Sequence, residues 1–452
     1  MKTIRTFEAF AGYGSQLMAL RRLEMAYPDQ LRVDPVGIAE IDKYALQAYH
    51  AVHGDVTNYG DITKIDWAKV PDFDLFTYSS PCQDFSQAGR QAGGERGSGT
   101  RSSLLWECER SIREKRPKWL LMENVAALVG KKFIKLFNQW QLTLERMGYS
   151  NFCMVMNAKN YGVPQNRERI FMVSILDENA RYEFPRPFPL EKRLRDVLEE
   201  QVDEKYYLSN RLIDCFETRN IIAKEKGNGF RFEPTDDNTV ASSITTHAGS
   251  RPDDNYIKEP VVLGWSRSPS GEVVNRHKVQ VANCVTSAKR DNAQNYVLES
   301  INIDREGNAR TINAHYEDMN VESAMSQPRD GFGYVRTAVV ESPIHRLHQQ
   351  DAVQHEDGIS RCLVVGSHGN SNDYTKTAVS NGNGYRIRKL TPRECFRLMD
   401  VDETDIDKIQ AAGISNSQQY KMAGNSIVVS CLYHIFDKLF IHTEIINKTL
   451  FD

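Results

Sequence analysis

Long apolar runs and closely spaced cysteine pairs are both missing from this sequence. No apolar stretch approaches the length of a membrane-spanning helix, and the first residues lead into a strand-like pattern in place of a signal peptide. Eight cysteines are scattered over 452 residues without a C-x-x-C pair, which argues against a zinc site or a disulfide framework. We therefore expect a reducing, cytoplasmic location, with no membrane contact and no metal.

A strong charge of either sign is also missing. The 57 Lys and Arg residues and the 60 Asp and Glu residues give a net charge of −3. This balance gives no overall sign of nucleic-acid binding, so a surface that binds DNA would have to be local. The length of 452 residues exceeds that of one ordinary hydrophobic core, and two domains are expected.

The first half of the chain alternates between strand-like and helix-like patterns. Apolar strand-like runs and segments with helical spacing follow one another at 3–10, 15–26, 33–41, 73–78, 103–115, 119–122 and 132–147. Such alternation predicts a parallel sheet with helices on both faces, the α/β class. Two further runs, 151–156 and 170–176, flank a polar turn and predict an antiparallel hairpin, which makes the sheet mixed but mostly parallel.

The second half changes character after a proline-rich segment at 185–189, the predicted exit from the sheet domain. From about 230 to 385 the apolar runs shorten, and polar loops separate short β-branched segments. Helical spacing returns near the end, with a helix start at 391–394 and a C-terminal helix at 428–439. Arg393 and Glu394 in that start are expected to be structural, as an ion pair that locks the return segment onto the core.

Cys82 is the first candidate for chemistry. It follows the apolar run 73–78 and Pro81, which stiffens the turn at the exit of a predicted strand. A nucleophile is often placed in this way, although cysteine is also a common core residue. Glu123 follows the run 119–122. Because the carboxyl ends of parallel strands share one edge, we expect Cys82 and Glu123 to meet there.

Five short motifs, taken in order, resemble those of the bacterial and phage DNA (cytosine-5)-methyltransferases. They are Phe10-x-Gly12-x-Gly14, Pro81-Cys82-Gln83, Glu123-Asn124-Val125, the Gln-x-Arg-x-Arg set of Gln165, Arg167 and Arg169, and Gly424-Asn425-Ser426. One such triplet is weak evidence, and five collinear ones are strong. The resemblance implies a discontinuous Rossmann-like methyltransferase domain of residues 1–205 and 385–452. Residues 206–384 would form a smaller, irregular β-rich domain that recognises the target sequence.

The resemblance also implies S-adenosylmethionine (SAM) as the methyl donor. The glycine turn would hold its carboxylate at a helix N-terminus, and Glu40 would accept hydrogen bonds from both ribose hydroxyls. Asp61 and Ile62 would hold the adenine, although a helix-cap residue is an alternative for Asp61. Nicotinamide enzymes share the glycine turn and Glu40, so these two features do not discriminate. The implied SAM-binding set is Phe10, Gly12, Gly14, Glu40, Asp61, Ile62, Pro81, Leu104, Asn425 and Ser426.

In this family a cysteine thiolate adds to cytosine C6, and C5 then takes the methyl group. The resemblance gives Cys82 the role of nucleophile and Glu123 that of the acid at N3. It places Arg169 on the cytosine O2 and assigns Arg167 the orientation of the glutamate. In the free enzyme, Glu123 is expected to pair with Arg167 or Arg169.

Residues 83–103 form a long, polar and glycine-rich segment. Its composition is typical of a surface loop, and its place after the nucleophile predicts a lid that closes over a flipped-out base. The predicted contacts to double-stranded DNA are Gln83, Ser86, Arg90, Arg96 and Arg101. For the three arginines, a solvated charge cluster is equally consistent with the sequence.

Two positions depart from the common family pattern, since Ser15 and Ser79 stand where glycines are frequent. A tRNA-directed relative is the nearest alternative enzyme, but its Cys-Phe-Thr segment is absent. A non-catalytic DNA-binding regulator is the alternative from another class, and the intact catalytic set argues against it. The expected protein is thus a monomeric enzyme that methylates a specific double-stranded DNA sequence. It would not physically require a companion restriction endonuclease.

Overall fold

The computed structural model describes residues 1–80, 104–225, 227, 231–260 and 385–442, together with the backbone of short strands between 262 and 366. The chain divides into two compact units. Unit 1 comprises Met1–Glu199, Asp237–Asn255 and Leu390–Asp452, and unit 2 comprises Glu200–Asp236 and Tyr256–Lys389. The predicted middle domain, 206–384, differs from unit 2 mainly in that residues 237–255 pack with unit 1.

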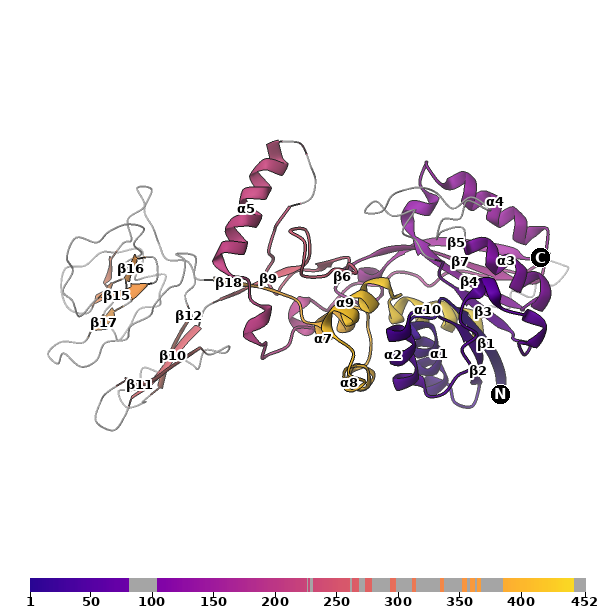
Figure 1. Cartoon of the computed structure of the whole chain (residues 1–452), viewed down its shortest axis with the longest axis horizontal. Coiled ribbons are helices and arrows are strands. Elements are labelled where there is room, and N and C mark those ends of the chain that lie inside the picture. The colour runs from indigo at the N-terminus through magenta and orange to yellow at the C-terminus, as the bar shows by residue number, and fades with distance from the viewer. Residues whose placement is uncertain are drawn as a thin grey trace, which may run out of the picture. The chain divides into compact units, whose positions relative to one another are not determined.

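Unit 1 is built on a six-stranded sheet with the strand order β2-β1-β3-β4-β7-β5 (Figure 1). Its strands are β1 (Lys2–Ala9), β2 (Leu31–Ala39), β3 (Leu75–Tyr78), β4 (Trp119–Val125), β5 (Ser150–Asn157) and β7 (Glu168–Ile175). The first four are parallel, whereas β7 runs antiparallel to both β4 and β5. The predicted mixed, mostly parallel sheet and its antiparallel hairpin are confirmed.

Helices cover both faces of this sheet. They are α1 (Ser15–Ala26), α2 (Lys43–His53), α3 (Leu105–Lys115), α4 (Ile134–Glu145) and α10 (Val429–Phe440). The side chains of α3 and α4 share one hydrophobic cluster with Phe7 and Ala9 of β1. Thr6 and Glu8 alternate with these residues and are buried on the opposite face, where Tyr49 of α2 donates a hydrogen bond to Glu8. In the described part of the chain, no helix combines the length and apolarity needed to cross a membrane.

The chain returns to unit 1 at Leu390 and forms α7 (Pro392–Arg397), α8 (Glu403–Ala411), α9 (Asn416–Asn425) and then α10. The hydroxyl of Thr391 accepts a hydrogen bond from the Glu394 N–H (3.2 Å), and the Glu394 carboxylate accepts one from the Thr391 N–H (2.8 Å). This reciprocal capping box explains why α7 begins here. It confirms the predicted helix start at 391–394, and α10 confirms the predicted C-terminal helix.

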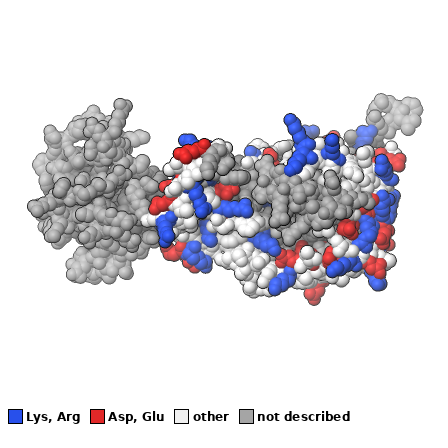
Figure 2. Space-filling model, turned by 45° about the horizontal axis from the view of Figure 1, so that its top comes forward, with Lys and Arg blue, Asp and Glu red and all other residues white. Residues whose placement is uncertain are grey.

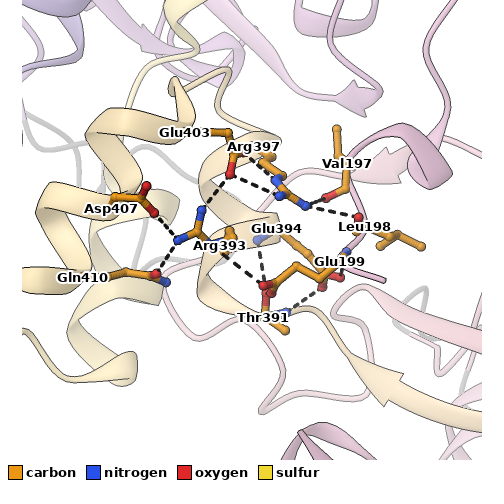
Figure 3. A network of polar contacts seen from close by, with 10 residues as sticks. All are labelled: Val197, Leu198, Glu199, Thr391, Arg393, Glu394, Arg397, Glu403, Asp407 and Gln410. Atoms are coloured by element: carbon orange, nitrogen blue, oxygen red, sulfur yellow. Dashed lines mark hydrogen bonds and ion pairs between the residues drawn. The ribbon is translucent and has the colours of Figure 1, made fainter. Parts of the chain in front are cut away.

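Figure 3 shows the polar network that fixes this return segment. Glu394 accepts a second backbone hydrogen bond, from Glu199 at 2.9 Å. Arg393 pairs with Glu403 of α8 at 2.6 Å, and Arg397 donates to the carbonyls of Val197 and Leu198 (both 3.1 Å). The structural role predicted for both residues agrees with these contacts, but the ion pairs of Arg393 are with Glu403 and Asp407, and Glu394 accepts hydrogen bonds from backbone N–H groups.

The described residues of unit 2 form a small hydrophobic cluster. Phe216 of α5 (Asn210–Glu225) packs with Phe232 and Tyr256, and β9 (Tyr256–Pro260) pairs antiparallel with β18 (Tyr385–Lys389). The other strands of unit 2 are short and form small sheets of two or three strands. They are β10 (Val262–Arg267), β11 (Val273–Lys278), β12 (Ala293–Val297), β13 (Thr311–Asn313), β14 (Tyr334–Arg336), β15 (Ala352–His355), β16 (Gly358–Arg361) and β17 (Val364–Gly366). This agrees with the short β-branched segments expected there.

Charges of both signs are mixed on the surface. On the face that Figure 2 presents, Lys and Arg alternate with Asp and Glu over the described atoms. This distribution fits the net charge of −3 and shows no large field of one sign on the described part of that face.

Candidate active site

Five elements of unit 1 bring the predicted site residues to one edge of the sheet. The parallel strands β1 to β4 end at this edge, and the antiparallel strand β7 begins there, since Val125 of β4 pairs with Arg169 of β7. Phe10 and Glu40 directly follow β1 and β2, and Glu123 lies near the end of β4. The carboxyl-end edge therefore gathers Phe10, Glu40 and Glu123, as parallel topology requires, and the predicted meeting of Cys82 with Glu123 stays a prediction.

The turn between β1 and α1 has an unusual backbone. Phe10, Gly12 and Gly14 all have positive φ angles, of 57°, 59° and 84°. Glycine is needed at position 14 for a second reason, because an added Cβ would lie 2.3 Å from the His53 ring. At Gly12 the same atom would meet nothing within 4 Å. The turn is thus tightly packed on its inner side and open at Gly12.

Glu40 links this turn to the next helix. Its Oε2 accepts a hydrogen bond from the Gly12 N–H (2.8 Å), and its Oε1 accepts one from the Asp42 N–H (2.7 Å). Asp42 in turn caps α2 through its side chain. The Glu40 carboxylate is therefore held in a fixed position beside the glycine turn. Ile41, which the sequence did not single out, follows it with 78% of its surface exposed.

Three further residues, Asp61, Ile62 and Leu104, are predicted to contact the cofactor. Asp61 caps the short 3₁₀ helix η1 (Ile62–Lys64), accepting hydrogen bonds from the N–H and hydroxyl of Thr63, which lower the pKa of Asp61. The helix-cap alternative for Asp61 is thus confirmed as its contact in this structure. Ile62 is buried in the main hydrophobic cluster, and the half-buried Leu104 packs against that cluster.

Glu123 is held by two side chains. Its Oε1 pairs with Nε of Arg169 at 3.1 Å, and its Oε2 accepts a hydrogen bond from the hydroxyl of Ser79. Only 6% of Glu123 is exposed. Of the two arginines expected as partners, the structure selects Arg169.

Asn124 fixes the exit of β3, the strand that leads toward Cys82. Its side-chain N–H donates to the carbonyl of Ser80 at 3.1 Å and to the Ser80 hydroxyl at 3.3 Å. Two adjacent residues of β4 thus hold two adjacent residues after β3.

The residues that follow Ser80 are outside the described part of the chain, so their predicted roles stay predictions. They are Pro81, Cys82, Gln83, Ser86, Arg90, Arg96 and Arg101.

Arg167 faces a different set of partners from the one expected. It is 2% exposed and donates to the Ser243 hydroxyl (3.2 Å) and to the carbonyls of Ile244 (3.1 Å), Gly424 (3.0 Å) and Ser426 (2.6 Å). Arg169 pairs with Glu123, and the expected orientation of the glutamate by Arg167 stays a prediction. Position 167 lies in the break between β6 (Gln165–Asn166) and β7, so strand alternation does not place it beside Arg169.

The segment around residues 241–246 belongs to this site region, which the sequence did not reveal. β8 (Ala241–Ser242) pairs with β6, and the backbone of Thr245 passes so close to Gly424 that an added Cβ there would lie 2.4 Å from it. Gly424 is therefore glycine because of close packing. The neighbouring Asn425 and Ser426 end α9, with Ser426 as its C-cap.

A buried acidic group lies behind the glycine turn. Glu8 is 1% exposed and accepts a hydrogen bond from Tyr49 at 3.2 Å. Burial raises the pKa of the Glu8 carboxyl to about 8. Burial also lowers the pKa of His53 to about 4, and its ring packs on Tyr49 with centroids 4.6 Å apart. No sequence pattern indicated this group, since Glu8 falls within an ordinary strand pattern.

Comparison with known proteins agrees with this geometry. The sequence matches the profile of C-5 cytosine-specific DNA methylases over residues 4–441. It is 40% identical to the type II methyltransferase M2.ScrFI of Lactococcus lactis subsp. cremoris, covering 97% of this chain and 99% of that protein. It is 31% identical to the orphan methyltransferase M.SPRI of Bacillus phage SPR, covering 99% of each chain.

Solved structures support the fold. The S. pombe Dnmt2 methyltransferase superposes with a TM-score of 0.55 and 14% identity, over 97% of this chain and 98% of that one. The Entamoeba histolytica methyltransferase EhMeth gives 0.58 and 14%, over the same shares of the two chains. The family match favours a DNA-directed enzyme over the tRNA-directed and non-catalytic alternatives. The chain belongs to the C-5 cytosine-specific DNA methylase family.

Proposed function

We propose that this chain transfers a methyl group from SAM to C5 of a flipped-out cytosine in a specific double-stranded DNA sequence, through a covalent bond between Cys82 and cytosine C6. The observation that carries the proposal is the anchored carboxyl of Glu123. It lies at the strand edge with Arg169 on one oxygen and Ser79 on the other. Such an arrangement suits a group that must meet a base in one defined orientation.

The glycine turn and Glu40 fit SAM. A ligand carboxylate suits the N-terminus of α1, and the open side of Gly12 allows close approach to the backbone. The fixed Glu40 carboxylate would accept hydrogen bonds from the ribose hydroxyls. The exposed apolar side chain of Ile41, directly after Glu40, would cover one face of the adenine. When bound, SAM supplies the electrophilic methyl group.

The protein side chains would activate the cytosine. C5 is a weak nucleophile, and addition of the Cys82 thiolate to C6 makes C5 enamine-like. The electron pair displaced toward N3 is stabilised there by a hydrogen bond from the Glu123 carboxyl. After C5 is methylated, loss of its proton and elimination of the thiolate restore the aromatic ring and the free Cys82.

Arg169 is suited to contact the cytosine O2. Its Nε pairs with Glu123, and its Nη1 donates to the carbonyl of Glu168 at 2.7 Å. Within the described residues, Nη2 has no protein acceptor. A guanidinium donates several hydrogen bonds in a fixed plane, so Nη2 remains available for an acceptor on the base. One arginine would thus link the acid at N3 and the oxygen at O2.

The remaining roles concern DNA and the cofactor pocket. Arg90, Arg96 and Arg101 would contact phosphates from the lid, and Gln83 and Ser86 would contact the DNA near the base. Asn425 and Ser426 would close the SAM pocket, and residues 206–384 would read the target sequence. We propose that the enzyme acts as a monomer and needs no companion endonuclease physically.

The first test is transfer of labelled methyl from SAM to unmethylated duplex DNA, with Cys82→Ser and Cys82→Ala alongside. We expect transfer by the wild type, and a loss of at least about 1,000-fold in both variants, because no thiolate remains to attack C6. Bisulfite sequencing of the product would give the recognition sequence. SAM binding measured by calorimetry should be retained in both variants. Transfer at the wild-type rate by Cys82→Ala would contradict the proposed nucleophile.

A further inference from the structure

Ser79 contacts the one oxygen of Glu123 that Arg169 leaves available. Arg169 Nε lies 3.1 Å from Oε1, and the Ser79 hydroxyl donates to Oε2. Ser79 is also one of the two positions where this chain departs from the glycine that is frequent in the resembling family. The contact therefore depends on the Ser79 side chain, which a glycine at this position would not provide.

The two partners of Glu123 differ in chemistry. A guanidinium can only donate hydrogen bonds, so it cannot accept a proton carried by the carboxyl group. Oε2, the oxygen that Ser79 contacts, is therefore the favoured site for a proton on Glu123, because Oε1 already accepts the N–H of Arg169. A serine hydroxyl both donates and accepts. Ser79 can thus remain hydrogen-bonded to Glu123 in the carboxylate form and in the carboxylic acid form.

We infer that Ser79 is a positioning residue for the methylation reaction, which keeps the Glu123 carboxyl in place and orients its O–H while its protonation changes. The inference rests on the proposed role of Glu123 at cytosine N3. Ser79 itself need not touch the base. The backbone at this point is held independently, since Asn124 donates to the carbonyl of the next residue, Ser80, at 3.1 Å. Removing the Ser79 hydroxyl should therefore free Oε2 of Glu123, which stays paired with Arg169 through Oε1, without releasing the strand exit.

The test compares four variants in single-turnover methyl transfer: Ser79→Ala, Ser79→Thr, Ser80→Ala and Glu123→Gln. We expect Ser79→Ala to slow transfer by about 10-fold, as for the loss of one hydrogen bond to an ionisable group. Ser79→Thr keeps a hydroxyl and should stay within about 3-fold of the wild type. Glu123→Gln should lose about 100-fold or more. Ser80→Ala is the matched control, because it removes a neighbouring hydroxyl that contacts Asn124 and leaves the carbonyl contact intact.

A second readout separates positioning from a loss of structure. The rate that Ser79→Ala loses should be recovered in Ser79→Thr, whose hydroxyl can again contact Glu123, whereas a loss of structure would lower the rate in both variants. Affinity for SAM and the melting temperature should stay at wild-type values.

Two outcomes would overturn the inference about Ser79: wild-type rates in Ser79→Ala while Glu123→Gln is inactive, or equal losses in Ser79→Ala and Ser80→Ala. An active Glu123→Gln would instead overturn the proposed role of the glutamate. The two failures are therefore distinguishable.

Discussion

The two halves of the active-site edge differ in the groups that form them, which are mainly backbone groups in one half and side chains in the other. At β1 and β2, the site consists mainly of backbone: positive φ angles at Phe10, Gly12 and Gly14, and a Gly12 N–H that donates to the one side chain named in this half, Glu40. At β3, β4 and β7, it consists of side chains, with Glu123 held between Ser79 and Arg169. The first half offers shape and backbone donors, and the second offers the side chains for which we propose roles in the chemical step.

This difference predicts which kind of substitution impairs each half. A site made of backbone is damaged by adding atoms, because the added atoms change the turn or block the ligand. A site made of side chains is damaged by removing atoms, because the functional group itself is lost. Additions on the first half should therefore weaken cofactor binding, and deletions on the second half should slow the chemical step.

Among the substitutions that compare the two halves, the largest effect is expected from Arg169→Gln, which removes the charged partner of Glu123 and the proposed contact to the cytosine O2. We expect methyl transfer to slow by about 100-fold, with little change in the melting temperature, because Arg169 is partly exposed at the edge. Single-turnover transfer and thermal melting would measure the two quantities.

The control is Arg167→Gln, the other arginine of the same motif. Arg167 is buried and holds four oxygen acceptors from segments far away in the sequence. Its replacement should lower the free energy of unfolding by about 3 kcal/mol, since buried acceptors lose their donor. If Arg167→Gln left stability unchanged and Arg169→Gln lowered it, the two assignments would be reversed.

The contrast between these arginines marks how far the sequence can predict. Local patterns were sufficient for the bounds of α1 and for the capping box at Thr391 and Glu394, because periodicity and caps involve neighbouring residues. Parallel topology was sufficient to bring Glu40 and Glu123 to one edge. The partners of Arg167 were not predictable, since Gly424 lies 257 residues away in the chain.

Other differences have equally specific causes. The sequence began the second strand at residue 33, but β2 starts at Leu31 and contains Pro35. Proline is tolerated there because β2 is the edge strand of the sheet. The segment around 241–246 looked like one of several short strands, and only its pairing with β6 assigns it to unit 1. Long-range pairing of two-residue strands leaves no periodic signal in sequence.

A smaller effect is expected at the backbone half, from Gly14→Ala. The residue has φ +84°, and the added Cβ would lie 2.3 Å from His53 and 2.8 Å from Tyr49. The resulting shift of the turn should raise the dissociation constant of SAM by about 10-fold, equivalent to about 1.4 kcal/mol. Calorimetric titration with SAM would measure it.

Gly413→Ala is the matched control for this variant. Gly413 has a similar φ of +74°, but an added Cβ would meet nothing within 4 Å. It should therefore cost some stability through backbone strain while SAM binding stays at the wild-type value. Equal losses of SAM affinity in both variants would mean that strain in general, and not the packing of this turn, controls the cofactor site.

The smallest effect concerns Glu8, the buried acid behind the backbone half. Its folded-state pKa is raised to about 8 from an ordinary value of 4.5, so the folded state holds a proton that the unfolded state releases. This contribution to stability is full at low pH and is lost as the pH rises toward 8. His53, with its pKa lowered to about 4 from 6.5, acts in the opposite direction below pH 6.5. Of these two groups, only Glu8 should therefore change the free energy of unfolding between pH 6.5 and 8.

Thermal melting of the wild type and Glu8→Gln over this interval tests the assignment. The amide of Gln does not titrate, so the melting temperature of Glu8→Gln should fall less than that of the wild type between pH 6.5 and 8. The difference should be about 2–4 °C for each kcal/mol of pH-dependent stability that the substitution removes. His53→Gln should leave the difference between these two pH values at the wild-type size. Parallel curves for the wild type and Glu8→Gln would mean that the acid is already ionised in the folded state. The half of the site at β1 and β2 would then contain a buried charge beside its glycine turn. It would no longer differ from the half at β3, β4 and β7 by lacking an ionised acid in its interior.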